Sequence, residues 1–199
     1  MVNTTRLRCL IGFFGGALPW IVALLLWRIP ASISETYYTW EAGAVFMIVL
    51  GSASVMLISY RGYDICDDIL NTLAGLFGFM ICLFPCESEY ELVGTFQIPV
   101  QTSAVIHYIA AASFFALLAY NSLFQFTKTS GNMTKEKKAR NVIYIVCGVG
   151  MVLSFGILLL PSFRIQVWLM ETIALTFFGI SWITKANRFR WLFAERSRQ

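Results

Sequence analysis

The sequence has little charge and a single histidine. Asp, Glu, Lys and Arg make up 13% of its 199 residues, while 58% of the residues are hydrophobic and the mean hydropathy is +0.69. An ordinary soluble domain carries about twice that charged fraction. One histidine also excludes a zinc site of standard spacing. The composition is that of a chain whose solvent is lipid.

Motifs for metals, phosphates and nucleic acids are missing as well. The five cysteines are scattered without a C-x-x-C pair, which favours a role as small apolar packing residues. There is no glycine-rich phosphate loop and no basic face with interleaved aromatic residues, so we expect no nucleic-acid partner. The sequence predicts no cofactor and no metal, and it marks no residue as catalytic.

Six long apolar runs are present instead. Each has about 17–24 residues, enough to cross a hydrocarbon core of roughly 30 Å as a helix. A backbone in lipid must satisfy its own hydrogen bonds, and these continuous runs lack the alternation of a barrel strand. We therefore predict an all-α fold, a polytopic bundle of six transmembrane helices that forms one domain over residues 1–199. The predicted spans are 9–27, 42–60, 69–85, 103–126, 142–160 and 165–184.

Lysine and arginine gather in the segments that would share one side of the membrane. Of the fifteen basic residues, only Arg28 and Arg164 fall on the other side, which is rich in glutamate. By the positive-inside rule, both termini should be cytoplasmic in a multi-pass protein of the cell (inner) membrane. The basic stretch 135–140 is interpreted as part of this signal, with a dedicated nucleic-acid or lipid-headgroup ligand as the alternative. A protein partner or a homo-oligomer stays open.

Two ionisable side chains lie inside apolar runs. His107 and Glu171 are at matched distances from the outer ends of spans four and six. An imidazole and a carboxylate at equal depth could form a charge-assisted hydrogen bond. Such residues are costly in lipid and often functional. The pair could tie helices together, contact a polar ligand or lipid headgroup, or act in acid–base catalysis.

The connection that follows span one is dense in hydroxyl groups. It is placed to cap the outer end of the bundle above His107 and Glu171, and Ser103 lies one helical turn before His107. We predict a polar ligand-binding pocket there. Its candidate residues are His107, Glu171, Ser103, Ser32, Ser34, Glu35, Tyr37 and Tyr38.

Polar residues are also matched on the cytoplasmic side. Asn71 of span three and Asn121 of span four have similar depths. Asp64, Asp67 and Asp68 precede span three, where acidic side chains suit a helix N-terminus. A metal or proton role for these acids is the alternative.

Several short stretches, taken in order, resemble known membrane proteins. SISETYY, SYRGYD, IHYIAAASFFALLAYNSLFQFTK and WLMETIALTFFGISWITK look like a family of uncharacterised six-span bacterial membrane proteins, over nearly the whole chain. The layout is distantly similar to the DRAM-type superfamily, which carries an I-S-x-T-like stretch after span one (Ile33–Thr36 here) and an early histidine in span four (His107 here). Members are linked to autophagy, GPI-lipid remodelling and lipid asymmetry, so the resemblance implies a lipid-related role.

A second comparison concerns membrane hydrolases of the CREST superfamily. Ser103–His107 matches their S-x-x-x-H element. Those proteins also need a later histidine pair and seven spans, which this chain lacks, so their zinc mechanism is not implied.

The resulting functional prediction is a non-catalytic membrane protein that binds or organises lipid through an outer-leaflet pocket, with membrane lipids as its partners. The alternative is a membrane-embedded lipid hydrolase or transferase that uses His107, Glu171 and a nearby serine. A small-solute transporter is a weaker alternative. No inverted repeat is visible, and the glycines in the spans are explained by close helix packing.

Overall fold

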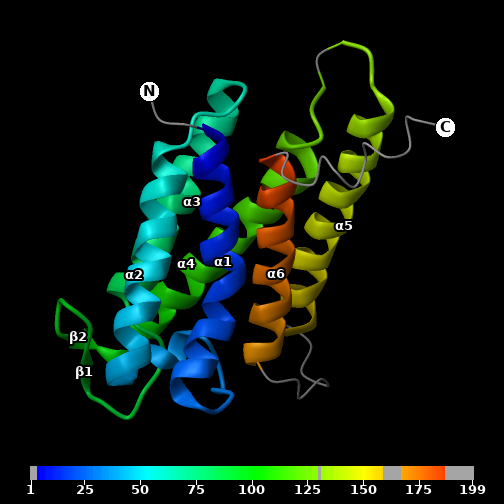
Figure 1. Ribbon diagram of the computed structural model, residues 1–199. Coiled ribbons are helices and arrows are strands. Elements are labelled where there is room, and N and C mark those ends of the chain that lie inside the picture. Colours follow the sequence, from blue (N-terminus) through cyan, green and yellow to red (C-terminus); the bar gives the residue numbers. More distant parts are fainter. Residues whose placement is uncertain (1–3, 130, 159–166, 187–199) are drawn as a thin grey trace.

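The computed structural model describes residues 4–129, 131–158 and 167–186. Six long helices stand side by side, and a short hairpin lies at one end (Figure 1). Between them run one 3₁₀ turn, η1, and one π-helical turn, η2. The elements are α1 (Thr4–Leu26), η1 (Ser34–Tyr38), α2 (Trp40–Ser59), α3 (Ile65–Leu83), β1 (Leu92–Val93), β2 (Ile98–Pro99), α4 (Val100–Tyr120), η2 (Asn121–Gln125), α5 (Lys135–Leu158) and α6 (Val167–Lys185).

All six long helices are apolar and long enough to cross a membrane. The predicted all-α bundle of six spans is therefore confirmed, and the chain is a multi-pass integral membrane protein. Five of the six helices begin earlier than the predicted spans, most clearly α1 at Thr4 rather than residue 9, α3 at Ile65 rather than residue 69, and α5 at Lys135 rather than residue 142. Polar residues at a membrane boundary can continue a helix because their side chains reach water.

Parts of the sequence predictions lie outside the described residues. These are the span limits at 159–160 and 165–166, together with the basic residues Arg164, Arg188, Arg190, Arg196 and Arg198.

The helices form a closed ring in chain order. Each packs against the next, and α6 returns to pack against α1. The starts of α1, α3 and α5 and the ends of α2 and α6 lie at the upper end of the bundle in Figure 1, which we call the basic end. The opposite end, called the loop end, carries η1 and the β1–β2 hairpin. Thr4 and Lys185 thus lie at the same end of the molecule.

Glycines allow neighbouring helices to approach closely. A Cβ atom on Gly12 of α1 would lie 2.8 Å from the carbonyl oxygen of Gly179 on α6. A Cβ on Gly75 of α3 would lie 2.6 Å from the carbonyl oxygen of Ser54 on α2. Both contacts support the packing role predicted for the glycines, because small residues let helix backbones meet in a membrane.

Candidate functional site

His107 is buried at the loop end and uses both ring nitrogens. The residue is only 3% exposed. Nδ1 lies 2.8 Å from the carbonyl oxygen of Phe84, and Nε2 lies 3.0 Å from the Ser34 hydroxyl. Since a carbonyl can only accept, this network assigns the proton to Nδ1, and Nε2 then accepts from the Ser34 hydroxyl. The imidazole is thus held in one tautomer and one orientation.

Glu171 bonds to the residue before Ser34. Its Oε2 accepts a hydrogen bond of 2.6 Å from the backbone N–H of Ile33. The hydrogen bonds of His107 go to Phe84 and Ser34, so the hydrogen bond that His107 and Glu171 could form with each other is not made. The physical reason is that segment 33–34 lies between the two side chains. Its Ile33 N–H bonds to Glu171 and its Ser34 hydroxyl bonds to His107, so each side chain already has a partner.

The loop after α1 is fixed to the loop end by further hydrogen bonds. The Trp168 backbone N–H donates to the Ala31 carbonyl at 3.0 Å, and the Tyr38 hydroxyl donates to the Cys86 carbonyl at 2.6 Å. Burial raises the pKa of both the Tyr37 and Tyr38 phenols, so both remain protonated. The loop covers the loop end of the bundle, as its position in the sequence predicts.

The remaining candidate residues hold the backbone in place. The Ser32 hydroxyl accepts from the Glu35 N–H at 3.0 Å, and the Glu35 carboxylate accepts from the Ala31 N–H at 2.9 Å. The Ser103 hydroxyl donates to the Pro85 carbonyl at 2.8 Å. Ser103 therefore ties the start of α4 to the segment after α3 instead of joining His107.

A narrow pocket extends from Ser34 and Glu171 into the centre of the bundle. These two residues supply its polar end, and all its other walls are apolar. The sequence predicted a polar pocket that includes Ser34 and Glu171, but it missed the apolar walls, because these come from six helices and no local pattern shows that their side chains leave space. The apolar lining consists of Leu18, Ile33, Phe46, Leu50, Ile81, Ala111, Phe114, Phe115, Phe155 and Leu175.

Two aromatic rings separate this pocket from a groove between α4 and α5. The rings of Phe115 and Phe155 lie 4.2 Å apart, centroid to centroid, and both line the pocket and the groove. The groove is otherwise lined by small and apolar residues such as Ala112, Ala116 and Val152. Only the rings of Phe115 and Phe155 thus separate the pocket from a face that contacts lipid when the bundle is in a membrane.

The two asparagines that the sequence places at similar depth contact each other near the basic end. Asn121 Nδ2 donates to Asn71 Oδ1 at 3.1 Å, and Asn71 Nδ2 donates to the Asp67 carboxylate at 2.8 Å. Asp64 caps α3 by accepting from the Asp67 N–H at 2.9 Å. The predicted role of these acids at a helix N-terminus is confirmed.

Comparisons with protein-family models, curated proteins and solved structures found no match to this chain. The resemblances noted in the sequence therefore stay predictions. What the helices themselves establish is a multi-pass integral membrane protein built on a ring of six spans, with no family identified.

Proposed function

We propose that the protein binds the acyl chain of a membrane lipid in the pocket at the loop end. One observation carries this proposal: the pocket is apolar along its length and polar only where Ser34 and Glu171 close it. An amphiphile has the same division between tail and head. Sites for small molecules commonly combine mostly apolar walls with a few fixed polar groups.

The fixed geometry of the polar end supports binding. His107 orients the Ser34 hydroxyl, and Ile33 holds the Glu171 carboxylate, so both groups are positioned before a ligand arrives. Preorganised groups lose little freedom on binding. The thin wall formed by Phe115 and Phe155 is a route by which a chain could enter from the surrounding lipid.

The charge distribution supports an orientation for this pocket. Among the described residues, Arg28 is the basic residue at the loop end, where Glu35, Glu41, Glu87, Glu89 and Glu91 also lie. We place the basic end in the cytoplasm of a cell whose plasma (inner) membrane holds the protein, by the positive-inside rule. The pocket then opens near the outer leaflet.

A lipid hydrolase or transferase is the second candidate, because the Ser34 hydroxyl lies 3.0 Å from His107 Nε2. Ser34 would attack an ester carbonyl while His107 accepts its proton and passes it to the departing alcohol; water would then release the acyl group. However, the Phe84 carbonyl occupies the place that a carboxylate takes in a catalytic triad. A neutral carbonyl orients the ring but stabilises an imidazolium less well. Binding is therefore the first choice.

A pocket-filling variant tests the proposal. Ala111 lines the pocket, so Ala111→Phe should occupy the space that an acyl chain needs. Ala44 is exposed on α2, and Ala44→Phe makes the same change on the outer face. We expect lipid that co-purifies with the wild type and with Ala44→Phe, measured by mass spectrometry per mole of protein, to fall severalfold in Ala111→Phe.

Two outcomes would contradict this reading. Equal lipid content in all three proteins would exclude the pocket as the binding site. Steady release of fatty acid from a phospholipid by the wild type, lost in Ser34→Ala, would replace binding with hydrolysis as the function.

A further inference from the structure

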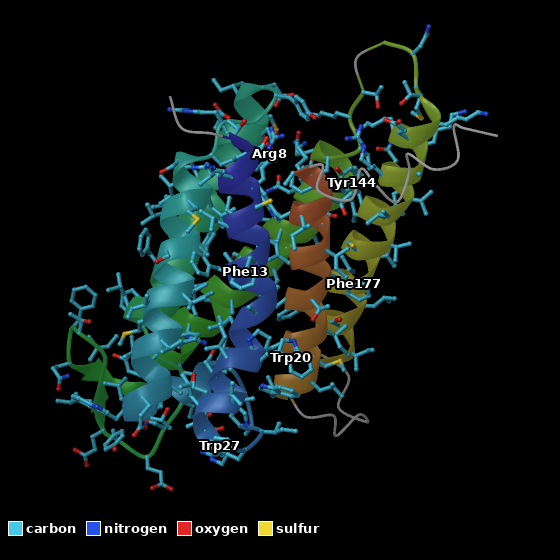
Figure 2. The ribbon with its side chains drawn as sticks, viewed as in Figure 1. Arg8, Phe13, Trp20, Trp27, Tyr144 and Phe177 are labelled. Carbon is cyan, nitrogen blue, oxygen red and sulfur yellow. The ribbon has the colours of Figure 1, made fainter. Side chains whose placement is uncertain are left out.

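A second hollow lies at the basic end, far from the pocket just described. It opens where the α2–α3 connection, the chain after η2, the start of α5 and the end of α6 meet. Figure 2 shows Tyr144, one of its wall residues, near this end of the bundle. Four of its seven wall residues are cations, and none carries a carboxylate: Tyr63, Lys128, Thr129, Lys137, Arg140, Tyr144 and Lys185.

Lys185 is the unusual member of this wall. The residue is 5% exposed, and its ammonium group has no hydrogen-bond partner among the described residues. Its Nζ lies 4.0 Å from the centre of the Tyr63 ring and 4.3 Å from that of Phe126. Two aromatic faces and the C-terminal end of α6 attract the positive charge, but they accept none of its three N–H bonds.

The carboxylates near this hollow are bonded to other groups. Asp64 is 2.7 Å from Lys128 Nζ. Asp67 accepts from Asn71 Nδ2 with one oxygen and from the Tyr63 N–H with the other. A buried charge without a hydrogen-bonded counterion is costly, so Lys185 calls for an anion from outside the described part of the chain.

Other donors are arranged around the same hollow. Lys137 Nζ donates to the Phe126 carbonyl at 2.8 Å, which fixes this ammonium beside the opening. Arg140 is half-buried in the wall and adds its positive charge to the hollow. The Tyr63 ring covers the Lys185 ammonium and is itself 64% exposed, so this ring lies between Lys185 and the solvent.

We propose that this hollow binds a phosphate group, with Lys185 as its buried anchor and Lys137 and Arg140 as flanking contacts. A phosphate suits the wall because its several oxygens accept from ammonium and guanidinium groups at once. The end of a membrane-spanning bundle is also the depth at which lipid phosphates lie. A lipid headgroup and a free phosphate share this chemistry, and the site is independent of the pocket at the loop end.

The test compares three soluble probes on the full-length protein in detergent. These are dioctanoyl phosphatidic acid, dioctanoylglycerol (the same lipid without phosphate) and inorganic phosphate. Binding is followed through the rise in the unfolding temperature as each probe is titrated. The variants are Lys185→Met and, as a matched control, Lys138→Met, which removes an exposed charge from the same end outside the hollow.

We expect phosphatidic acid, but not dioctanoylglycerol, to raise the unfolding temperature of the wild type and of Lys138→Met. In Lys185→Met, affinity should fall at least about tenfold, as loss of one charge-assisted hydrogen bond implies. Without probe, Lys185→Met should unfold at a higher temperature than the wild type, because an apolar side chain replaces an unsatisfied buried charge. That gain also shows that the variant folds.

The outcomes distinguish a lipid headgroup from a free phosphate as the ligand, and some of them would contradict the proposed site. A response to phosphatidic acid alone assigns the site to a lipid headgroup, and an equal response to inorganic phosphate assigns it to the free anion. Equal affinity of Lys185→Met and the wild type for both probes would overturn the proposal. So would an equal response to dioctanoylglycerol, or a lower unfolding temperature of probe-free Lys185→Met, which would make Lys185 a purely structural cation–π contact.

Discussion

Lys185 at the basic end and His107 at the loop end are both buried ionisable side chains, but their surroundings differ. At the loop end, His107 and Glu171 are bonded to η1 and to the segments beside it. At the basic end, the Lys185 ammonium is just as enclosed but has two aromatic rings as its neighbours and no acceptor among the described residues. Both ring nitrogens of His107 are bonded within the protein and stabilise the fold, whereas the Lys185 ammonium has N–H groups left for a ligand.

The comparison also separates backbone from side-chain partners. The acceptors and donors that satisfy the loop end are largely backbone groups, namely the Phe84 carbonyl and the Ile33 N–H. At the basic end, the bond between Asn121 and Asn71 runs between two side chains, although Asp67 and Lys137 there also bond to backbone groups. Removing the His107 side chain should therefore cost more than removing that of Asn121, because it leaves a backbone carbonyl without its partner.

The largest effect is expected for His107→Ala. The change removes two hydrogen bonds and leaves the Phe84 carbonyl and the Ser34 hydroxyl without their partner. We expect the free energy of unfolding in detergent micelles to fall by about 2–4 kcal/mol. Ile109→Ala is the control, since that side chain is 59% exposed on the same helix. Equal losses in the two variants would show that the bonds of His107 do not stabilise the loop end.

A smaller effect is expected for Asn121→Leu at the basic end. Asn121 makes one hydrogen bond to Asn71, while its own Oδ1 has no partner. The variant removes one unsatisfied atom and creates another, so the free energy of unfolding should change by less than about 1 kcal/mol. Asn71→Leu, measured by the same unfolding assay, should cost more because it also takes a donor from the buried Asp67 carboxylate. The reverse order would contradict the proposed difference between these bonds.

The smallest effect is expected for the ion pair at the surface of the basic end. The hydrogen bond from Lys128 lowers the pKa of the Asp64 carboxyl below its ordinary value of 3.8. The pair therefore stabilises the folded chain above that value, and this contribution is lost as the pH falls through the lowered pKa. Both side chains are over two-fifths exposed, so water and salt screen the pair.

Lys128→Met tests this pair through thermal unfolding at two pH values. The variant should unfold at a slightly lower temperature than the wild type at pH 7, and the difference should vanish once the pH falls below the lowered pKa of Asp64. Added salt should shrink it at pH 7 as well. A difference that persists at low pH would assign the effect to packing of the Lys128 side chain.

The candidate site was predictable only in its location. The matched depths of His107 and Glu171 near one end of their spans, with the hydroxyl-rich loop at the same end, pointed to the loop end. The partners were not predictable, because the Phe84 carbonyl and the Ile33 N–H are backbone groups that every residue carries. Ser34 differs from Ser32 and Ser103 only in where the chain places its hydroxyl.

Lys185 shows the same limit of sequence-based prediction at the basic end. In the sequence it is one of many basic residues that mark a membrane side, and nothing distinguishes it from Lys138. The structure buries Lys185 and exposes Lys138. The reason is that Lys185 ends α6 between Tyr63 and Phe126, which both lie far from it along the chain.

The sequence by itself determined the six membrane-crossing helices, since apolar length and backbone hydrogen bonding leave few other structures in lipid. It also determined the unequal charge of the two ends. Only the tertiary structure decided which polar side chains satisfy one another, where six helices leave a pocket between them, and which lysine is enclosed without an acceptor. Those properties depend on distances between residues far apart in the chain. The periodicity of one helix carries no information about such distances.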